Sequence, residues 1–489
     1  MSPSKIQGGE ASPLAPVSSP ALVPELGRRA AGSSATPLSG GAPRNAPVWP
    51  VVTIDSIKAN KQNAITIGPF GSRMKSECYV PQGVPVIRGN NLTGGRSFSN
   101  DYVYITEEKA SDLKNCMTQM GDLVFPHRGA IGEVGIVPES SKPFIISSSL
   151  MKLTCDPSKA DSLFVFYFFK SDAGRFELLK NSSQVGTPGI GQPLSSLKSI
   201  TLPLPALPIQ KAIAHILGTL DDRIELCRRM NETLEAMARA LFKDWFIDFG
   251  PVRAKMEGRE PPGLSPEIAA LFPSKLVESE LGEIPEGWEC GSILKLARLL
   301  SGGTPKTSEP EYWDGEIPWA SAKDVSQCGQ GFLIQTERTI TKRGLEESST
   351  KMIPALSTVV VARGATTGRL TMFGIDMAMN QTCYGLYSRI GTPFSLYCHS
   401  KHFMESMVLS AHGSVFDTIT TGTFEATPVL LPSVSSLKAF EQQVTPHFEQ
   451  ILTNLRKVAS LSTLRDTLLP KLLSGELSVP EAMLQVEAA

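Results

Sequence analysis

The sequence has few features that could hold a metal ion or a disulfide framework. Its eight cysteines include no Cys-x-x-Cys pair, and no close group of cysteine and histidine has the spacing of zinc ligands. We therefore expect reduced thiols, as in a cytoplasmic protein, and no metal site. The sequence likewise offers no pattern that predicts a bound cofactor.

Long apolar runs and an excess of charge of either sign are also absent. The longest strongly apolar run, Phe164–Phe169, is far shorter than the ~20 residues that span a bilayer, and it predicts a buried strand or helix segment. The net charge is −1. Binding to nucleic acid would therefore need a local basic surface, because the chain as a whole is not basic.

The common catalytic motifs are missing as well. Gly302-Gly-Thr-Pro-Lys-Thr307 only superficially resembles a phosphate-binding loop, because Pro305 occupies a glycine position. There is no HExxH, GxSxG or kinase motif, and no Asn/Asp-Pro-Pro-aromatic tetrapeptide of amino-group DNA methyltransferases. These absences favour a binding protein over an enzyme, although catalytic residues dispersed along the chain would escape such a search.

The first 48 residues differ in composition from the rest of the chain. They are rich in Pro, Ala, Ser and Gly and have no apolar periodicity, so residues 1–48 are predicted to be a disordered tail. No continuous apolar core follows basic residues there, which argues against a signal peptide. A dispensable tail or an over-extended start is the expected interpretation.

Two long heptad patterns are the strongest positive signal in the sequence. One series runs from Ile213 to Trp245 and the other from Phe440 to Leu472, in steps of four and three, with a constant offset of 227 residues between them. Four to five heptads are typical of a coiled coil, although a single such helix could simply pack on its own globular domain. The shared frame favours pairing of the two helices as an antiparallel coiled coil. Pro446 should kink the second helix or mark its start.

The predicted seam combines apolar and polar residues. Its apolar positions are Ile213, Leu217, Leu220, Ile224, Leu234, Leu241, Trp245, Phe440, Val444, Ile451, Val458, Leu461, Leu468 and Leu472, with Cys227 and Ala238 in the same frame. Its polar positions are Asn231, His447, Asn454 and Arg465. Buried polar residues in a seam select partner and register at a cost in stability.

The segments before the two helices also match each other in order. Val84-Pro-Val-Ile-Arg88 corresponds to Ile317-Pro-Trp-Ala-Ser321, and Asp122-Leu-Val-Phe-Pro-His-Arg128 corresponds to Thr358-Val-Val-Val-Ala-Arg363. Each copy has roughly 150 residues of short β segments and turns, enough to bury a core of its own. The pattern predicts a tandem duplication of an α+β globule of mixed type, not a solenoid or a doubly wound sheet.

These patterns divide the chain into six predicted segments. They are a tail (1–48), a first globule (49–205), a central helix (206–250), a linker with one short helix at 266–272 (251–287), a second globule (288–433) and a C-terminal helix (434–479).

The matched loops contain residue types that DNA recognition needs. Arg can bond guanine, Asn and Gln can bond adenine, and Lys, Ser and Thr hold phosphates. In the first copy the candidates are Ser72, Arg73, Lys75, Arg88, Asn90, Asn91, His127, Arg128, Gln184 and Thr187. In the second copy they are Thr304, Lys306, Thr307, Ser321, Lys323, Asp324, Arg363, Thr366, Arg369, Asn380 and Gln381.

Arg128 and Arg363 allow two interpretations. Each is followed by Gly-Ala, which would let the backbone approach a phosphate or a groove wall. Equally, each arginine could brace a sheet edge through a buried carboxylate. The spacing of these residues does not by itself distinguish the two.

Several longer segments resemble the specificity subunit of type I restriction–modification systems. Gly68-Pro-Phe-Gly-Ser-Arg-Met-Lys75, Gly83-Val-Pro-Val-Ile-Arg-Gly-Asn-Asn-Leu92 and Gly121-Asp-Leu-Val-Phe-Pro-His-Arg-Gly-Ala130 resemble one type of its target-recognition domain. Ser301-Gly-Gly-Thr-Pro-Lys306 and Tyr312-Trp-Asp-Gly-Glu-Ile-Pro-Trp319 resemble another. The segment 242–258 resembles the end of its central conserved region, and the segment 468–476 resembles its C-terminal conserved region. The likeness covers nearly everything from Trp49 to Val479.

This resemblance implies two target-recognition domains that each read half of a bipartite site in double-stranded DNA. The conserved helices would set the spacing of the half-sites and dock two methyltransferase subunits that bind S-adenosylmethionine. A restriction subunit would use ATP, and this chain would itself catalyse nothing. The N-terminal tail is not part of the family pattern, and Gly218-Thr219 is expected to loosen the first helix. The alternative from another class is a coiled-coil scaffold or adaptor without DNA affinity.

Overall fold

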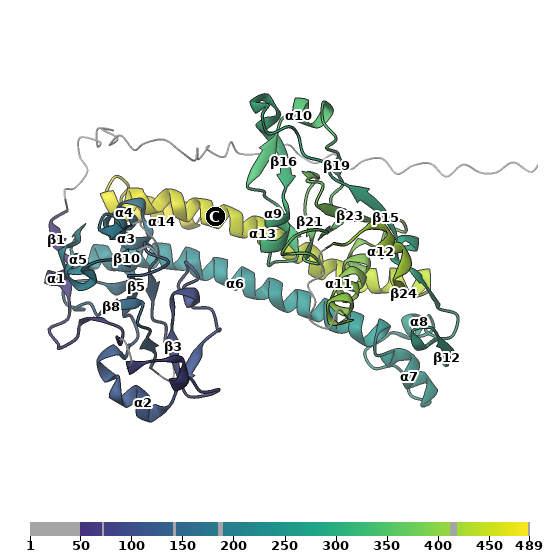
Figure 1. Cartoon of the computed structure of the whole chain (residues 1–489), viewed down its shortest axis with the longest axis horizontal. Helices are drawn as coiled ribbons and strands as arrows, with labels where there is room; N and C mark the ends of the chain where they lie inside the picture. The colour runs from purple at the N-terminus through teal and green to yellow at the C-terminus, as the bar shows by residue number, and fades with distance from the viewer. Residues whose placement is uncertain (1–48, 71–72, 140–142, 184–188, 411–417, 488–489) are drawn as a thin grey trace, which may run out of the picture. The chain divides into compact units, whose positions relative to one another are not determined.

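Two long helices organise the fold, and a mixed α/β globule precedes each of them (Figure 1). The computed structural model describes residues 49–70, 73–139, 143–183, 189–410 and 418–487, all within one compact unit. The predicted tail, 1–48, lies outside the described residues. Helix α6 spans Leu207–Phe246 and helix α13 spans Val434–Ser474.

Helices α6 and α13 pack along each other in opposite directions. Asn231 and Asn454 are hydrogen-bonded at 2.8 Å, and the rings of Trp245 and Phe440 lie 5.9 Å apart. Since the residue number falls on α13 as it rises on α6, the pair is antiparallel. The predicted pairing of the two heptad series within one chain is therefore confirmed. At 1.5 Å per residue, each helix is about 60 Å long.

The seam positions lie on the inner faces of this pair. In both series the residues are buried or half-buried, including the polar Asn231, Asn454 and Arg465. His447 is half-buried, whereas its neighbour Phe448 is fully buried. Phe448 thus supplies apolar contact that the heptad frame had assigned to position 447.

The two sites expected to disturb the helices, Pro446 and Gly218-Thr219, do not interrupt them. Helix α13 begins at Val434, capped by the Ser433 hydroxyl, so Pro446 does not mark its start. Pro446 is exposed, and the carbonyl that loses its hydrogen bond can face water. Helix α6 continues through Gly218, where the peptide carbonyl accepts a hydrogen bond from Arg96.

The first globule contains eleven short strands among its described residues. They are β1 (Val51–Thr53), β2 (Ile65–Ile67), β3 (Val84–Ile87), β4 (Val103–Ile105), β5 (Leu123–Pro126), β6 (Gly135–Ile136), β7 (Ile145–Ile146), β8 (Leu150–Leu153), β9 (Ser182–Ser183), β10 (Gly189–Ile190) and β11 (Thr201–Pro203). Its helices are α1 (Ile54–Ile57), α2 (Glu107–Asp112), α3 (Ser162–Lys170), α4 (Asp172–Leu179) and α5 (Pro193–Ser199). The apolar run Phe164–Phe169 forms most of helix α3.

The second globule has a similar order of elements, with differences among the short ones. Its described strands are β14 (Glu289–Ser292), β15 (Ala297–Ser301), β16 (Trp313–Ala320), β17 (Phe332–Leu333), β18 (Arg338–Ile340), β19 (Met352–Ile353), β20 (Thr358–Val361), β21 (Leu370–Phe373), β22 (Met377–Met379), β23 (Cys383–Ser388) and β24 (Pro428–Leu431). Its helices are α9 (Ala322–Gln327), α10 (Lys342–Glu346), α11 (Pro393–Ser410) and α12 (Thr421–Ala426).

The sheets show the duplication directly. The order β2-β8-β5-β6 of the first globule recurs as β15-β23-β20-β21 in the second, where β17 extends it. The order β4-β3-β7 recurs as β18-β16-β22, extended by β19, and the pair β1-β11 recurs as β14-β24. The pairs β3–β7 and β16–β22 are parallel, whereas most other pairs are antiparallel. Each globule is thus of mixed type, as predicted.

Each globule packs on one end of the helix pair. The core of the first globule, with helix α3, continues into Ile213–Ile224 of α6 and Leu461–Leu473 of α13. The second globule, through helix α11, packs against Ala238–Phe249 and Leu437–Leu455. Both helices therefore contribute to both cores, and the apolar surface they bury stabilises the whole arrangement.

The segment between the globules has more structure than the predicted linker. The expected helix is present but short, α8 (Pro266–Ala269). In addition there is a helix α7 (Gly250–Met256) and a hairpin of β12 (Leu276–Ser279) and β13 (Gly282–Pro285). This segment is ordered because its apolar residues reach a core: Val252 and Phe272 are buried in one cluster with Trp245 and Trp288. After α13, a further helix α14 (Val479–Glu487) packs on α6.

Among the described residues no helix is long and apolar enough to cross a membrane. In that same part of the chain no group of three or more His, Cys, Asp or Glu residues could hold a metal ion. The eight cysteines are all free thiols.

Candidate nucleic-acid interface

In the first globule three strand ends meet around one short loop, residues 147–149. The amide of Ser147 donates to the carbonyl of Ile87 at the end of β3, at 2.9 Å. The amide of His127, after β5, donates to Ser149 at 2.9 Å. A Cβ atom at Gly68 would lie 1.9 Å from the Ser147 carbonyl oxygen, so only glycine fits there. We name residues 147–149 the first central loop.

The second globule builds the same arrangement around residues 380–382, the second central loop. The amide of Asn380 donates to Ala320 at the end of β16, at 3.0 Å. The amide of Ala362, after β20, donates to Thr382 at 2.8 Å. A Cβ atom at Gly302 would lie 2.3 Å from the Asn380 carbonyl oxygen. The two globules therefore present the same set of loops although their residues differ.

Arg128 and Arg363 occupy equivalent places beside these loops. Each follows the central strand of its sheet, and each is paired through its backbone with a distant segment, at Gly189 and at Thr418. Both side chains are exposed. Neither forms an ion pair within the described ranges, so the carboxylate required by the bracing interpretation is not found there. As far as the described residues show, both guanidinium groups can bind an external acceptor.

The remaining candidates of the first globule divide into exposed and buried residues. Arg73, Lys75 and Asn90 are exposed, whereas Arg88 is half-buried and donates to the carbonyl of Asp101 at 2.9 Å. Asn91 is fully buried, accepts from the Arg88 amide at 2.8 Å and donates to Asp101 at 2.9 Å. In this conformation Asn91 holds its loop together and has no surface to offer to DNA.

His127 also lies inside the first globule. Its Nε2 atom lies 2.9 Å from the Ser148 carbonyl, to which it must donate, and burial lowers the pKa of the imidazole. A neutral, buried ring positions the first central loop next to Arg128. Ser72, Gln184 and Thr187 lie outside the described residues.

In the second globule the exposed candidates are Lys306, Thr307, Thr366, Arg369 and Gln381. Thr304, which is half-buried, donates its hydroxyl to the Gln381 side chain. The Asn380 side chain accepts a hydrogen bond from the Thr382 amide at 3.1 Å, so part of its hydrogen-bonding capacity is used within the loop.

Three further candidates of the second globule have local partners. Ser321 and Asp324 form a reciprocal cap at the start of α9, with the Asp324 carboxylate 2.9 Å from the Ser321 amide. Lys323 pairs with Glu337 at 2.6 Å, but both side chains are about 60% exposed. Such a pair is weak and exchanges readily with another acceptor.

Two tryptophans shape the second site and were not among the predicted contacts. The Nε1 atoms of Trp313 and Trp319 donate to the carbonyls of Lys306 and Gly303, at 3.1 and 3.0 Å. The guanidinium carbon of Arg338 lies 3.5 Å from the centre of the Trp313 ring. These contacts fix the loop that carries Thr304, Lys306 and Thr307. In the sequence, this arrangement is indicated only by the two closely spaced tryptophans of Trp313-Asp-Gly-Glu-Ile-Pro-Trp319.

A second surface lies on helix α6, away from its partner helix. Leu226, Met230 and Met237 are 59%, 40% and 50% exposed, and their spacing places them on one face of the helix. The residues at the same frame positions of α13 are Thr453, Lys457 and Leu464. The exposed apolar face, which we name the α6 stripe, is thus specific to one of the two helices.

Comparisons with known proteins agree with this duplicated architecture. The model of a family described as the type I restriction modification DNA specificity domain matches the chain twice, at residues 67–236 and 285–455. The first match begins in the first globule and the second at the end of β13, just before the second globule, and each ends in the long helix that follows. Together the two matches cover more than half of the chain.

Several relatives have names from the same family. The chain is 27% identical over 441 residues to the type I restriction enzyme HindI specificity subunit of Haemophilus influenzae, covering 79% of this chain and 94% of that protein. It is 26% identical over 391 residues to the MjaIX specificity subunit of Methanocaldococcus jannaschii, covering 78% and 85%. The solved S subunit of a type I restriction–modification system from M. genitalium matches its fold with a TM-score of 0.53, at 16% identity, over 89% of this chain and 98% of that one.

Proposed function

The chain belongs to the type I restriction–modification DNA specificity family, and from this premise we propose that each globule reads one half of a bipartite site in double-stranded DNA. The observation that carries the proposal is the repeated central loop with an exposed arginine beside it, Arg128 in one globule and Arg363 in the other. An exposed guanidinium can bond guanine bidentately in the major groove. Neighbouring Lys and Thr side chains suit phosphate contacts.

The helix pair would set the spacing between the half-sites. The first globule packs on the beginning of α6 and the end of α13, and the second on the opposite ends of both helices. We call each central loop with its arginine, Arg128 or Arg363, a reading surface. A rigid antiparallel helix pair of fixed length would keep the two reading surfaces at one separation. A duplicated globule without such a rigid connection would accept half-sites at many spacings.

The partners in this proposal are two methyltransferase subunits that bind S-adenosylmethionine and methylate adenine, and restriction subunits that use ATP. The chain itself would catalyse nothing, and the complex would act on DNA in the cytoplasm. The α6 stripe supports docking of a partner helix, because exposed apolar residues at heptad spacing suit a helical partner.

Exchange of one globule tests the assignment of half-sites. Residues 51–205 would be replaced by the corresponding segment of a relative with a different target, and the complex with its methyltransferase would be expressed in cells. Mapping of methylated adenines should show a change in one half-site only, with the other half and the spacing retained. A change in both halves, or in neither, would contradict the proposal.

Point variants sharpen the same test. Arg128→Ala and Arg363→Ala should each weaken discrimination at a base of its own half-site by about 1–3 kcal/mol, as expected for a lost bidentate contact. Arg259→Ala, which removes an exposed arginine between the globules, is the matched control. If the purified complex showed no salt-dependent affinity for DNA, the coiled-coil scaffold would be the better interpretation.

A further inference from the structure

In each globule one buried tyrosine donates a hydrogen bond to a carboxylate on α6. In the first globule, Tyr167 of α3 donates its hydroxyl to Asp221 Oδ2 at 2.7 Å. Arg465 of α13 donates to the other oxygen of that carboxylate at 2.7 Å. Tyr167 is only 2% exposed. We name this group, which joins the globule to both long helices, the first latch.

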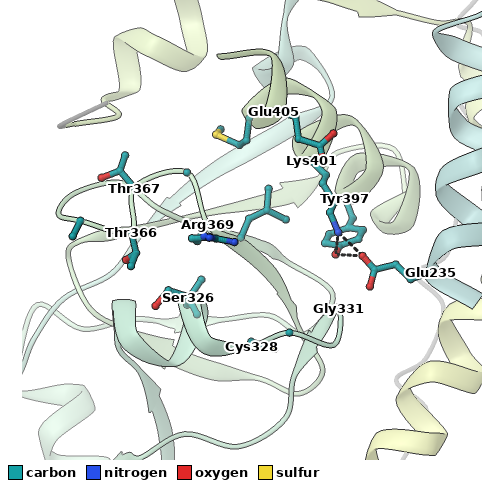
Figure 2. Close-up of a pocket in the computed structure, with 16 residues that line it drawn as sticks. Glu235, Ser326, Cys328, Gly331, Thr366, Thr367, Arg369, Tyr397, Lys401 and Glu405 are labelled. Carbon is teal, nitrogen blue, oxygen red and sulfur yellow. Dashed lines mark hydrogen bonds and ion pairs between the residues drawn. The ribbon is translucent and has the colours of Figure 1, made fainter. Parts of the chain in front are cut away.

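The second globule has a corresponding group (Figure 2). Tyr397 of α11 donates its hydroxyl to Glu235 Oε1 at 2.9 Å, and Lys401 of the same helix donates to that oxygen at 2.5 Å. Tyr397 is also 2% exposed, and burial raises the pKa of its hydroxyl, which stays protonated and able to donate. We name this group the second latch.

The recurrence of the latches is not an automatic result of the duplication. The two tyrosines lie on corresponding helices of the globules, but the two carboxylates are not related by the 227-residue offset of the duplication, because both lie on α6. The residue that corresponds to Asp221 is Phe448, whose ring lies 5.8 Å from that of Tyr397. The chain therefore builds the same contact, a globule tyrosine on an α6 carboxylate, with different residues in each half.

A second polar contact holds the first turn of each of these globule helices. The side chain of Gln210 accepts from the amide of Asp161, the N-cap of α3, at 2.9 Å. Glu441 of α13 accepts from the amides of Phe394 and Ser395 in the first turn of α11, at 3.1 and 2.8 Å. Each globule helix is thus bonded to the helix pair at two separate points. Two directional contacts fix an orientation that non-directional apolar packing alone would leave less determined.

The second latch lies at the edge of a pocket in the second globule. This pocket of about 830 Å³, formed almost entirely by residues of the second globule, lies beside α6, and Glu235, Tyr397 and Lys401 line one side of it. Thr366 and Arg369, both candidates for DNA contact, lie on the loop opposite them (Figure 2). The second latch thus faces this loop across the pocket.

We propose that Tyr167 and Tyr397 are positioning residues, which fix the orientation of each reading surface on the helix pair and thereby restrict the spacing of half-sites that the protein accepts. This inference rests on the proposed function. It goes further by assigning the tolerance for spacing to two buried side chains that are not among the candidate DNA contacts. The helices would set the mean separation, and the latches would limit deviation from it.

The test uses Tyr397→Phe in the full chain with its methyltransferase, since phenylalanine keeps the ring packing and removes only the hydroxyl. Initial methylation rates would be measured on duplexes with the native spacer and with spacers one base pair shorter or longer. The ratio of native to altered spacer should fall about tenfold, the effect expected of one buried hydrogen bond to a charged group, with unchanged half-site sequences. Tyr167→Phe should act in the same direction.

Tyr384→Phe is the matched control, because Tyr384 lies in the second globule outside the latch and should leave the ratio unchanged. A lower melting temperature in Tyr397→Phe with a wild-type ratio would show a merely structural role and overturn the inference. Altered half-site preference would overturn it too. If Tyr397→Phe failed to fold, Tyr167→Phe would decide the question alone. Absence of sequence-dependent methylation in the wild type would instead contradict the proposed function.

Discussion

At the scale of single residues, Glu441 shows how tertiary contacts change a side chain that the sequence presents as an ordinary surface charge. Its carboxylate lies under the first turn of α11 and is 9% exposed. Burial raises its pKa to about 7, and the two amide hydrogen bonds offset only part of that effect. The folded chain therefore holds a proton on Glu441 at pH values where the unfolded chain has released it.

This difference predicts a pH-dependent stability. A pKa that is higher in the folded than in the unfolded state contributes stability below about pH 4.5 that is lost as the pH rises through about 7. The loss would be about 3 kcal/mol at most, at ~1.4 kcal/mol for each unit of pKa. Chemical unfolding of the wild type and Glu441→Gln at pH 5 and pH 8 should show that the substitution reduces this loss.

The exposed Glu449→Gln on the same helix is the control and should behave as the wild type. Equal pH dependence in Glu441→Gln and the wild type would show that Glu441 does not titrate in this range.

At the scale of elements, α6 and α13 share one heptad frame, but their outer faces, which point away from the seam, differ in polarity. Inside the pair, Asn231 and Asn454 form a polar contact between buried positions, which favours one register. Outside, only α6 has an exposed apolar face. The helices are thus duplicates in their seam and distinct in their outer surfaces.

The outer surface leads to a prediction about assembly. Met230→Lys together with Met237→Lys places two charges on the α6 stripe without touching the seam, so the chain should fold as the wild type does. Binding of at least one methyltransferase subunit should weaken about thirtyfold or more, as expected for central apolar contacts of an interface, at roughly 2 kcal/mol or more. Light scattering of the reconstituted complex would measure the subunits bound per chain.

Thr453→Lys, at the α13 position equivalent to Leu226, is the control for added charge and should not change the stoichiometry. Full assembly of the Met230/Met237 variant would remove the α6 stripe from the docking surface.

At the scale of the whole molecule, both globules depend on both long helices. Asp221 contacts Arg465 and Asn231 contacts Asn454, so by the same spacing Arg229 lies opposite Arg456, near the centre of the pair. An insertion in one helix alone would break the contacts of the other. A matched insertion in both would lengthen the pair and keep its register.

We predict that one added heptad after Arg229 and another after Arg456 will move the accepted spacing. Seven residues add about 10 Å to the pair, which corresponds to roughly three base pairs at ~3.4 Å each. Methylation of duplexes with graded spacers should lose the native optimum and favour longer spacers, while both half-site sequences stay the same. An unchanged optimum would mean that the helices do not measure the spacing.

The sequence alone was sufficient for the features that repeat locally. The heptad series, the constant offset of 227 and the match of the two globules all follow from short-range periodicity and from comparing one half of the chain with the other. These patterns predicted two mixed globules and a paired helix, and the structure confirms both. The linker was less predictable, because its aromatic residues find their partners only in a distant core.

Tertiary structure decided which polar residues face outward. From sequence, Asn91 and Asn90 were equal candidates, as were His127 and Arg128, yet one of each pair is buried and the other exposed. The latches gave no sequence signal, since Tyr397 and Glu235 are separated by 162 residues. Periodicity determines which face of an element is apolar. Contacts between distant segments depend on how those elements pack, and the reading surfaces and their attachments are built from such contacts.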